Sequence, residues 1–96
     1  MKIQVLAFEG CPNDQLTIAL IEELLRKRGL SAAVERVEVT AETAAELRFL
    51  GSPTVQIDGV DIEPAARART AFGICCRTYP GGKGVPPREM IEAAIG

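Results

Sequence analysis

Phe8-Glu9-Gly10-Cys11-Pro12-Asn13 is the stretch that decides the fold, because a strand-like pattern ends in it and a helical pattern begins. Residues 3–8 are nearly all apolar and rich in strand formers, which predicts a central strand covered on both faces. The glycine breaks this run, and Pro12 suits the first position of a helix with Leu16, Leu20 and Leu24 on its apolar face. Cys11 is therefore predicted at a helix N-terminus, where unpaired N–H groups and the helix dipole favour a thiolate over a thiol.

Composition excludes several classes of function. The 96 residues suffice for one domain with a single core, and the net charge of −2 gives no basic surface for nucleic acid. No apolar run approaches the roughly 20 residues of a membrane span. The chain has no histidine, which excludes imidazole acid–base catalysis, Cys-His dyads and histidine zinc sites. We therefore expect a cytoplasmic protein that binds neither nucleic acid nor membrane and uses no cofactor; its oligomeric state stays open.

The rest of the chain alternates between strand and helix patterns. A first helix is expected over 13–28 with Gly29 as its stop, a second strand over 33–39, and a second helix from 41 to about 50. Asp58-Gly59 between two short β-rich runs predicts a hairpin, a long loop follows over 63–85, and Pro86-Pro87 opens the last helix. The expected order is βαβαββα: an α/β fold with a four-stranded mixed sheet, helices on both faces and a long loop before the last helix.

With this order, Gly10-Cys11-Pro12 at the first strand–helix turn and Gly51-Ser52-Pro53-Thr54 before the third strand, the chain resembles the thioredoxin-like superfamily in its minimal, glutaredoxin-sized form. The resemblance spans about residues 2–62 and the last helix. It implies that the Ser52–Pro53 peptide bond is cis, that Pro53 lies against Cys11, and that the adjacent backbone pairs with an extended substrate chain. The candidate substrate-binding residues are thus Pro12, Ser52, Pro53 and Thr54.

A closer resemblance covers residues 8–13, 51–55, 76–79 and 84–86. These segments look like those of a group of small bacterial thioredoxin-like proteins, some of which carry names linked to alkylmercury lyase. We interpret that name as an inherited label and take no activity from it. The departure from thioredoxin itself lies three residues after Cys11, where Asp14 stands in place of a second cysteine. No Cys-x-x-Cys disulfide can form, and a carboxylate there is expected to oppose a Cys11 thiolate.

Two further thiols lie side by side in the long loop. Cys75 and Cys76 either form a buried patch with Ile74 that ties the loop to the core, or one of them resolves a mixed disulfide or sulfenic acid on Cys11. Adjacent cysteines in an extended segment point in opposite directions, so only one can face Cys11. We prefer Cys76, because the resemblance covers it and Arg77 is available to favour its thiolate.

The leading hypothesis is a thiol-disulfide redox protein with Cys11 and Cys76 as catalytic residues and a protein or small-molecule thiol or disulfide as substrate. Two alternatives stay open. In the first, the chain is a non-catalytic binding module of the same fold, and Cys11 is a small buried hydrophobic residue. In the second, the three thiols bind a soft ion such as Hg(II), As(III) or Cu(I). The spacing of the cysteines predicts no metal site.

Overall fold

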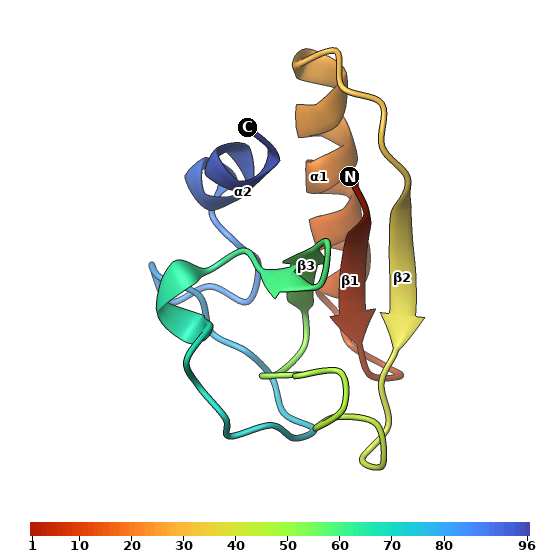
Figure 1. Cartoon of the computed structure of the whole chain (residues 1–96), viewed down its shortest axis with the longest axis vertical. Helices are drawn as coiled ribbons and strands as arrows, with labels where there is room; N and C mark the ends of the chain where they lie inside the picture. Colours follow the sequence, from red (N-terminus) through yellow and green to blue (C-terminus); the bar gives the residue numbers. More distant parts are fainter.

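The computed structural model describes residues 1–96 and is built on a four-stranded sheet in the order β2-β1-β3-β4 (Figure 1). Strand β1 (Ile3–Ala7) lies parallel to β2 (Val34–Glu38) and antiparallel to β3 (Thr54–Ile57), which pairs with the short β4 (Val60–Asp61). The expected mixed sheet is confirmed. The apolar β1 is central, and the more polar β2 is an edge strand, as their compositions predict.

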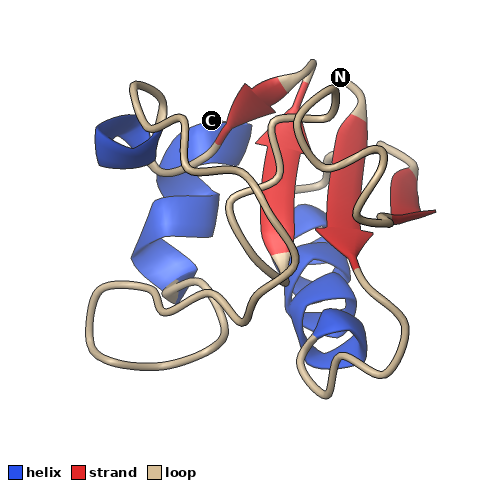
Figure 2. Cartoon of the chain, turned by 90° about the horizontal axis from the view of Figure 1, so that it is seen from below, coloured by secondary structure: helices blue, strands red, loops and turns tan.

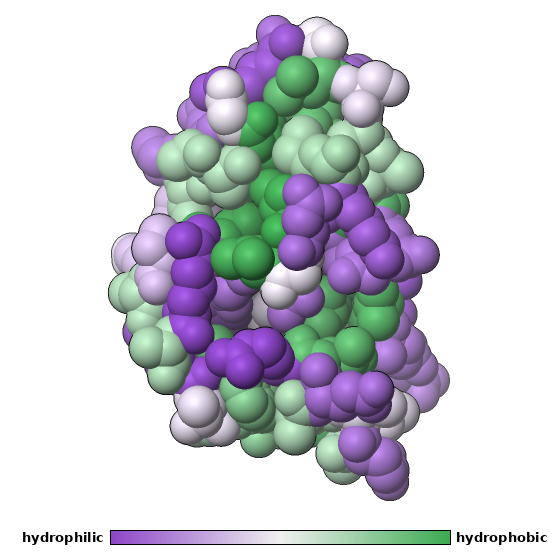
Figure 3. Space-filling view, in the orientation of Figure 1, coloured by the Kyte–Doolittle hydropathy of each residue, from purple (hydrophilic) through white to green (hydrophobic).

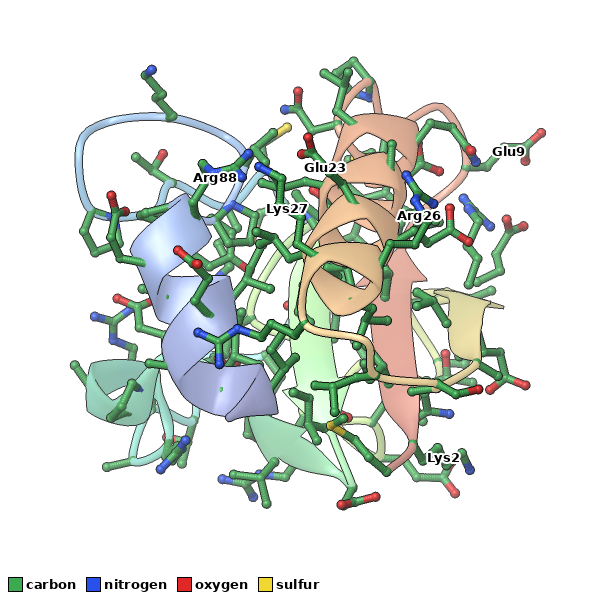
Figure 4. The ribbon with its side chains drawn as sticks, turned by 90° about the horizontal axis from the view of Figure 1, so that it is seen from above. Lys2, Glu9, Glu23, Arg26, Lys27 and Arg88 are labelled. Atoms are coloured by element: carbon green, nitrogen blue, oxygen red, sulfur yellow. The ribbon has the colours of Figure 1, made fainter.

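Both regular helices cover one face of this sheet. Helix α1 (Asp14–Lys27) and helix α2 (Arg88–Ile95) lie side by side, and Glu23 of α1 pairs with Arg88 of α2 at 3.1 Å (Figure 4). Their core with the strands consists of Ile3, Val5, Ile21, Leu24, Leu25, Val55, Ile62, Ile91 and Ile95. Leu16 is exposed, because the buried face of α1 passes through Thr17, Ile21 and Leu24 instead. Neither helix combines the length and the apolar composition that spanning a membrane requires.

The prediction of a second helix from residue 41 to about residue 50 is wrong. Residues 41–48 form turns, because their hydrogen bonds change spacing: Thr43 N–H reaches back three residues, Leu47 N–H four and Phe49 N–H five. Arg48 then takes a left-handed conformation with φ 57°, which ends any helical run. This segment still covers the sheet face opposite α1, where Leu6, Val39, Ala44 and Phe49 form a second cluster. Figure 2 shows α1 on one side of the strands and loop segments on the other.

The segment between β4 and α2 is an ordered long loop, as expected. It begins with a single 3₁₀ turn, η1 (Pro64–Ala66), and then makes two isolated bridges, Ser52 with Cys76 and Tyr79 with Lys83. The first of these bridges ties the loop to the residue that precedes β3. The loop therefore lies against the part of the chain that the resemblance associates with function.

Candidate functional site

Cys11 lies in the turn that leads from β1 into α1. Gly10 has φ 87°, and the Cys11 N–H donates to the Phe8 carbonyl at 3.3 Å, which folds the chain back from the end of the strand. The helix begins at Asp14 with Asn13 as its N-cap, so Pro12 precedes the cap and is not the first helical residue. Pro12 is exposed, whereas Cys11 is buried with 8% of its surface accessible. Only a small part of Cys11 is therefore accessible to a reagent in solution.

Asp14 is paired with Arg36, so its charge does not stand free beside Cys11. Arg36 Nε donates to Asp14 at 2.7 Å, and the same guanidinium pairs with Glu38 at 2.9 Å and reaches the Phe8 carbonyl at 3.4 Å. Burial raises the pKa of Asp14, but the hydrogen bonds from Arg36 and from Gln15 N–H outweigh it and hold that pKa below its usual 3.8. The hydrogen bond to Asp14 in turn raises the pKa of Arg36. The carboxylate that was expected to oppose a Cys11 thiolate is thus accompanied by the positive charge of Arg36.

Ser52, Pro53 and Thr54 form a buried turn that leads into β3, whose first residue is Thr54. The Ser52–Pro53 peptide bond is cis, the isomer that the resemblance implies. Thr54 Oγ1 donates to the Gly51 carbonyl at 2.6 Å, which closes the turn. All three side chains are buried, and the Ser52 hydroxyl is buried without a hydrogen-bond partner. This differs from Pro12, the fourth candidate substrate-binding residue, which faces solvent.

The backbone groups of Ser52 are both taken by the long loop. Its N–H donates to the Cys75 carbonyl at 2.8 Å, and its carbonyl accepts from Arg77 N–H at 3.1 Å. Residues 75–79, which we call the strap, thus pair with Ser52 as a parallel strand would, with Cys76 directly opposite it. The structure therefore brings Cys76 beside the residue before Pro53.

Two buried side chains anchor the strap. Arg77 pairs with Asp61 at 2.7 Å and with Glu63 at 2.9 Å, and its guanidinium lies over the Tyr79 ring at 4.5 Å. The Tyr79 hydroxyl donates to the Pro53 carbonyl at 2.6 Å. The prediction that Arg77 assists the Cys76 thiolate is wrong, because these acidic partners hold its guanidinium in the interior.

The charge states of the anchors follow from the same contacts. Burial lowers the pKa of Arg77, but its hydrogen bond to Asp61 and the neighbouring phenol and carboxylates outweigh this and raise it above its ordinary value. Burial likewise raises the pKa of Tyr79 well above its ordinary value. Arg77 therefore stays charged, and the Tyr79 phenol stays protonated as a donor at neutral pH.

Gly51 permits the close approach of the strap. It has φ 115°, and a Cβ there would meet Arg77 Cβ at 3.0 Å and Cys75 Sγ at 3.1 Å. Both the conformation and the space require glycine. The same contacts show that Cys75 and Arg77 flank Gly51, while Cys76, between them, pairs with Ser52.

The interpretation of residues 74–76 as a buried patch is wrong, because Ile74, Cys75 and Cys76 are all exposed and the buried anchors come later in the strap. The three cysteines are free thiols. No three side chains of the Cys, Asp, Glu or His type gather where they could hold a metal ion, so the soft-ion alternative lacks a preformed three-thiol site.

Sequence reasoning missed the roles of Asp61, Glu63, Arg77 and Tyr79. One local signal was available: Asp61 and Glu63 alternate with the buried Ile62, which puts two carboxylates on the same side of a short extended segment. Two acidic groups on one side require a cation if they are buried. The sequence alone, however, does not identify Arg77 as that cation.

Comparison with known proteins adds one finding. A family model described as "Thioredoxin domain" matches residues 1–62. Neither the curated proteins nor the solved structures give a match. The matched part contains Cys11 and the Ser52–Thr54 turn, whereas the strap with Cys76 lies beyond it.

Proposed function

The chain belongs to the thioredoxin-domain family, and on that premise we propose that it is a thiol-disulfide redox protein with Cys11 as nucleophile and Cys76 as resolving thiol. The family membership alone supports a thioredoxin-like redox or binding role. The finer assignment rests on one observation, the pairing of Ser52 with Cys76 in the strap. That pairing holds a second thiol next to the turn that the resemblance associates with Cys11.

The contacts of Cys75 support Cys76 as the partner. The Cys75 sulfur lies 3.7 Å from the Gly73 carbonyl and 4.0 Å from the Leu50 carbonyl, so it is directed at backbone of its own surroundings. Successive side chains of an extended segment point in opposite directions. Cys76 therefore points away from these carbonyls and shares the side of the bridge on which Ser52 lies.

The proposed reaction is two successive thiol–disulfide exchanges. The Cys11 thiolate attacks one sulfur of a substrate disulfide, which forms a mixed disulfide and releases the other sulfur as a thiolate. The Cys76 thiolate then attacks Cys11 Sγ, which releases the second substrate thiolate and leaves a Cys11–Cys76 disulfide. The substrate gains two electrons, the protons of the two protein thiols pass to the products, and an external dithiol restores the protein. Because Cys11 is 8% exposed, we expect small disulfides to react faster than protein chains.

Mild oxidation with diamide, followed by peptide mapping, tests the proposal. We expect a reversible Cys11–Cys76 disulfide in the native chain and in Cys75→Ser, and none in Cys76→Ser. In the chain-entropy account, closing the long loop between Cys11 and Cys76 adds roughly 4 kcal/mol to the free energy of unfolding. The oxidised form should therefore also melt at a higher temperature. A Cys75–Cys76 bridge, or three thiols that stay free, would contradict the resolving role of Cys76.

The second candidate is a binding module without redox chemistry. Two observations favour it: Asp14 occupies the place of a second active-site cysteine, and the backbone groups of Ser52 are already paired with the strap. The rate of Cys11 alkylation against pH separates the two candidates. Reaction that already saturates near neutral pH supports the nucleophile, whereas a thiol that reacts only in alkaline solution or on unfolding supports the module.

A further inference from the structure

A pocket of about 220 Å³ lies away from the cysteines, between the β3–β4 hairpin, η1 and the loop that follows it. Its distinctive lining is three arginines, Arg48, Arg67 and Arg69, together with the apolar side chains of Leu50, Val60 and Phe72. The space-filling view shows a hollow on this face with hydrophilic groups around it (Figure 3). The pocket thus combines a cationic rim with an apolar wall.

The three pocket arginines have no acidic partners. Every ion pair of the protein uses other basic residues. The one carboxylate that lines the pocket belongs to Asp61, and both of its oxygens already accept hydrogen bonds from Arg77. The pocket therefore carries excess positive charge in a chain whose net charge is −2. Local charge of this sign attracts anions.

Two of these arginines are held in place by contacts that leave guanidinium donors free. Arg48 lies over the Phe72 ring at 5.1 Å and donates through Nη2 to the Arg67 carbonyl at 3.3 Å. Arg67 donates through Nε to the Asp61 carbonyl at 2.8 Å. A guanidinium has five N–H donors, so most donors of both groups stay available. Arg48 also carries the left-handed φ of 57°, a conformation of the kind that is retained at ligand sites.

We propose that this pocket binds a small organic molecule that carries an oxyanion, with the oxyanion on the pocket arginines and a planar or apolar body against Phe72. The guanidinium fork matches the geometry of phosphate and carboxylate oxygens. Pockets for drug-sized ligands measure roughly 300–1,000 Å³, so a volume of about 220 Å³ favours a ligand of one ring or less. The site is independent of Cys11.

Calorimetric titration of the full chain with phenyl phosphate, benzoate and inorganic phosphate tests the proposal. We expect saturable binding of phenyl phosphate or benzoate, about tenfold weakened in Arg69→Gln, whose side chain belongs to none of the protein's ion pairs. Arg26→Gln is the matched control, because Arg26 is an exposed arginine on α1 outside the pocket (Figure 4). Binding in the control should stay within about twofold of the native value, and Cys11→Ser should bind normally whatever becomes of the redox proposal.

The same titrations define the results that would overturn it. Equal weakening in Arg26→Gln and Arg69→Gln would show diffuse charge attraction in place of a site. Inorganic phosphate that binds as tightly as phenyl phosphate would remove the role assigned to Phe72. Absence of saturation with both organic anions at millimolar concentration would remove the pocket as an oxyanion site.

Discussion

Two arginines hold the two sides of the candidate site, and they do so in different surroundings. Arg36 of β2 joins this strand to the start of α1, just after the Cys11 turn, by pairing with Asp14, and it also pairs with Glu38 of the same strand. Arg77 joins the strap to the hairpin by pairing with two others, Asp61 and Glu63. The Arg36 side chain is 29% exposed and its partners 10% and 54%, whereas the Arg77 side chain is 3% exposed and its partners 8% and 9%.

This difference in solvent exposure decides how much each arginine cluster contributes to the free energy of unfolding. An exposed ion pair contributes about 0–1 kcal/mol, because water and salt screen it. Removing one partner of a buried pair costs about 3–5 kcal/mol, since it leaves a charge without compensation in the interior. The same chemical arrangement therefore makes the Cys11 side of the site adjustable and the strap side rigid. The following substitutions test that comparison.

Arg77→Ala should have the largest effect, a loss of about 3–5 kcal/mol in the free energy of unfolding, because Asp61 and Glu63 stay buried without a cation. Urea unfolding followed by circular dichroism measures it. If this variant does not fold, Arg77→Lys supplies the value, with a smaller loss, since a lysine keeps the charge but cannot bridge the carboxylates with a planar fork. A loss below about 1 kcal/mol would mean that the buried Arg77 ion pairs contribute no more than the partly exposed Arg36 pairs.

Tyr79→Phe should lose roughly 1–3 kcal/mol, because the Pro53 carbonyl loses the hydroxyl that donates to it in the interior. The ring that lies under Arg77 is retained, so the ion pairs should persist. Hydrogen exchange at the Arg77 amide, which donates to Ser52, provides a local readout. Unchanged stability and exchange would mean that Arg77 alone anchors the strap.

Arg36→Ala should lose only about 1 kcal/mol, measured by the same urea unfolding, because the cluster is partly exposed. The result sharpens the comparison if it is several-fold smaller than that for Arg77→Ala. Arg88→Ala, which breaks the exposed pair with Glu23, is the control for a contact at the surface and should change stability by a few tenths of a kcal/mol. If Arg36→Ala lost as much stability as Arg77→Ala, the argument that solvent exposure weakens the Arg36 ion pairs would be contradicted.

The smallest effect is a pH dependence. The pKa of Asp14 is lowered in the folded chain, so its contribution is complete above its usual value of 3.8 and is lost as the pH falls through the lower folded value. Without Arg36, the hydrogen bond and the charge that lower this pKa are lost, so the variant should lose less stability than the native chain as the pH falls. Stability of Arg36→Ala and native protein compared between about pH 2 and pH 7 should differ most near neutrality and converge in acid. Parallel stability curves for the two proteins would show that the pKa of Asp14 does not depend on Arg36.

Local patterns predicted the elements whose causes are local. The apolar run of β1 and the stop at Gly29, which has φ 64°, behaved as expected. Asp58 and Gly59, both with positive φ, form the predicted hairpin turn. The prediction of a helix over residues 41–48 failed. The left-handed conformation of Arg48 and the packing of Phe49 in the second core cluster override the helical composition of this segment.

The candidate site was predictable only in part. Cys11 and the Ser52–Thr54 turn are marked by their own neighbours in the sequence, which is why they were found. The strap depends on partners far along the chain: Arg77 and Glu63 are 14 residues apart, and Tyr79 and Pro53 are 26 apart. Nothing in a single sequence pairs such residues, so the anchors were read as loop and Arg77 was assigned to the wrong partner.

A chain cut after residue 62 would keep every residue that the family model matches, and yet it would not be the same molecule. It would lose both backbone partners of Ser52, the hydroxyl that donates to Pro53 and the cation that neutralises Asp61, together with the side chains of α2 that complete the core. The segment that the family model matches and the segment that forms the core and the candidate site therefore have different boundaries. The last third of the chain completes the structure of the segment that carries the family's mark.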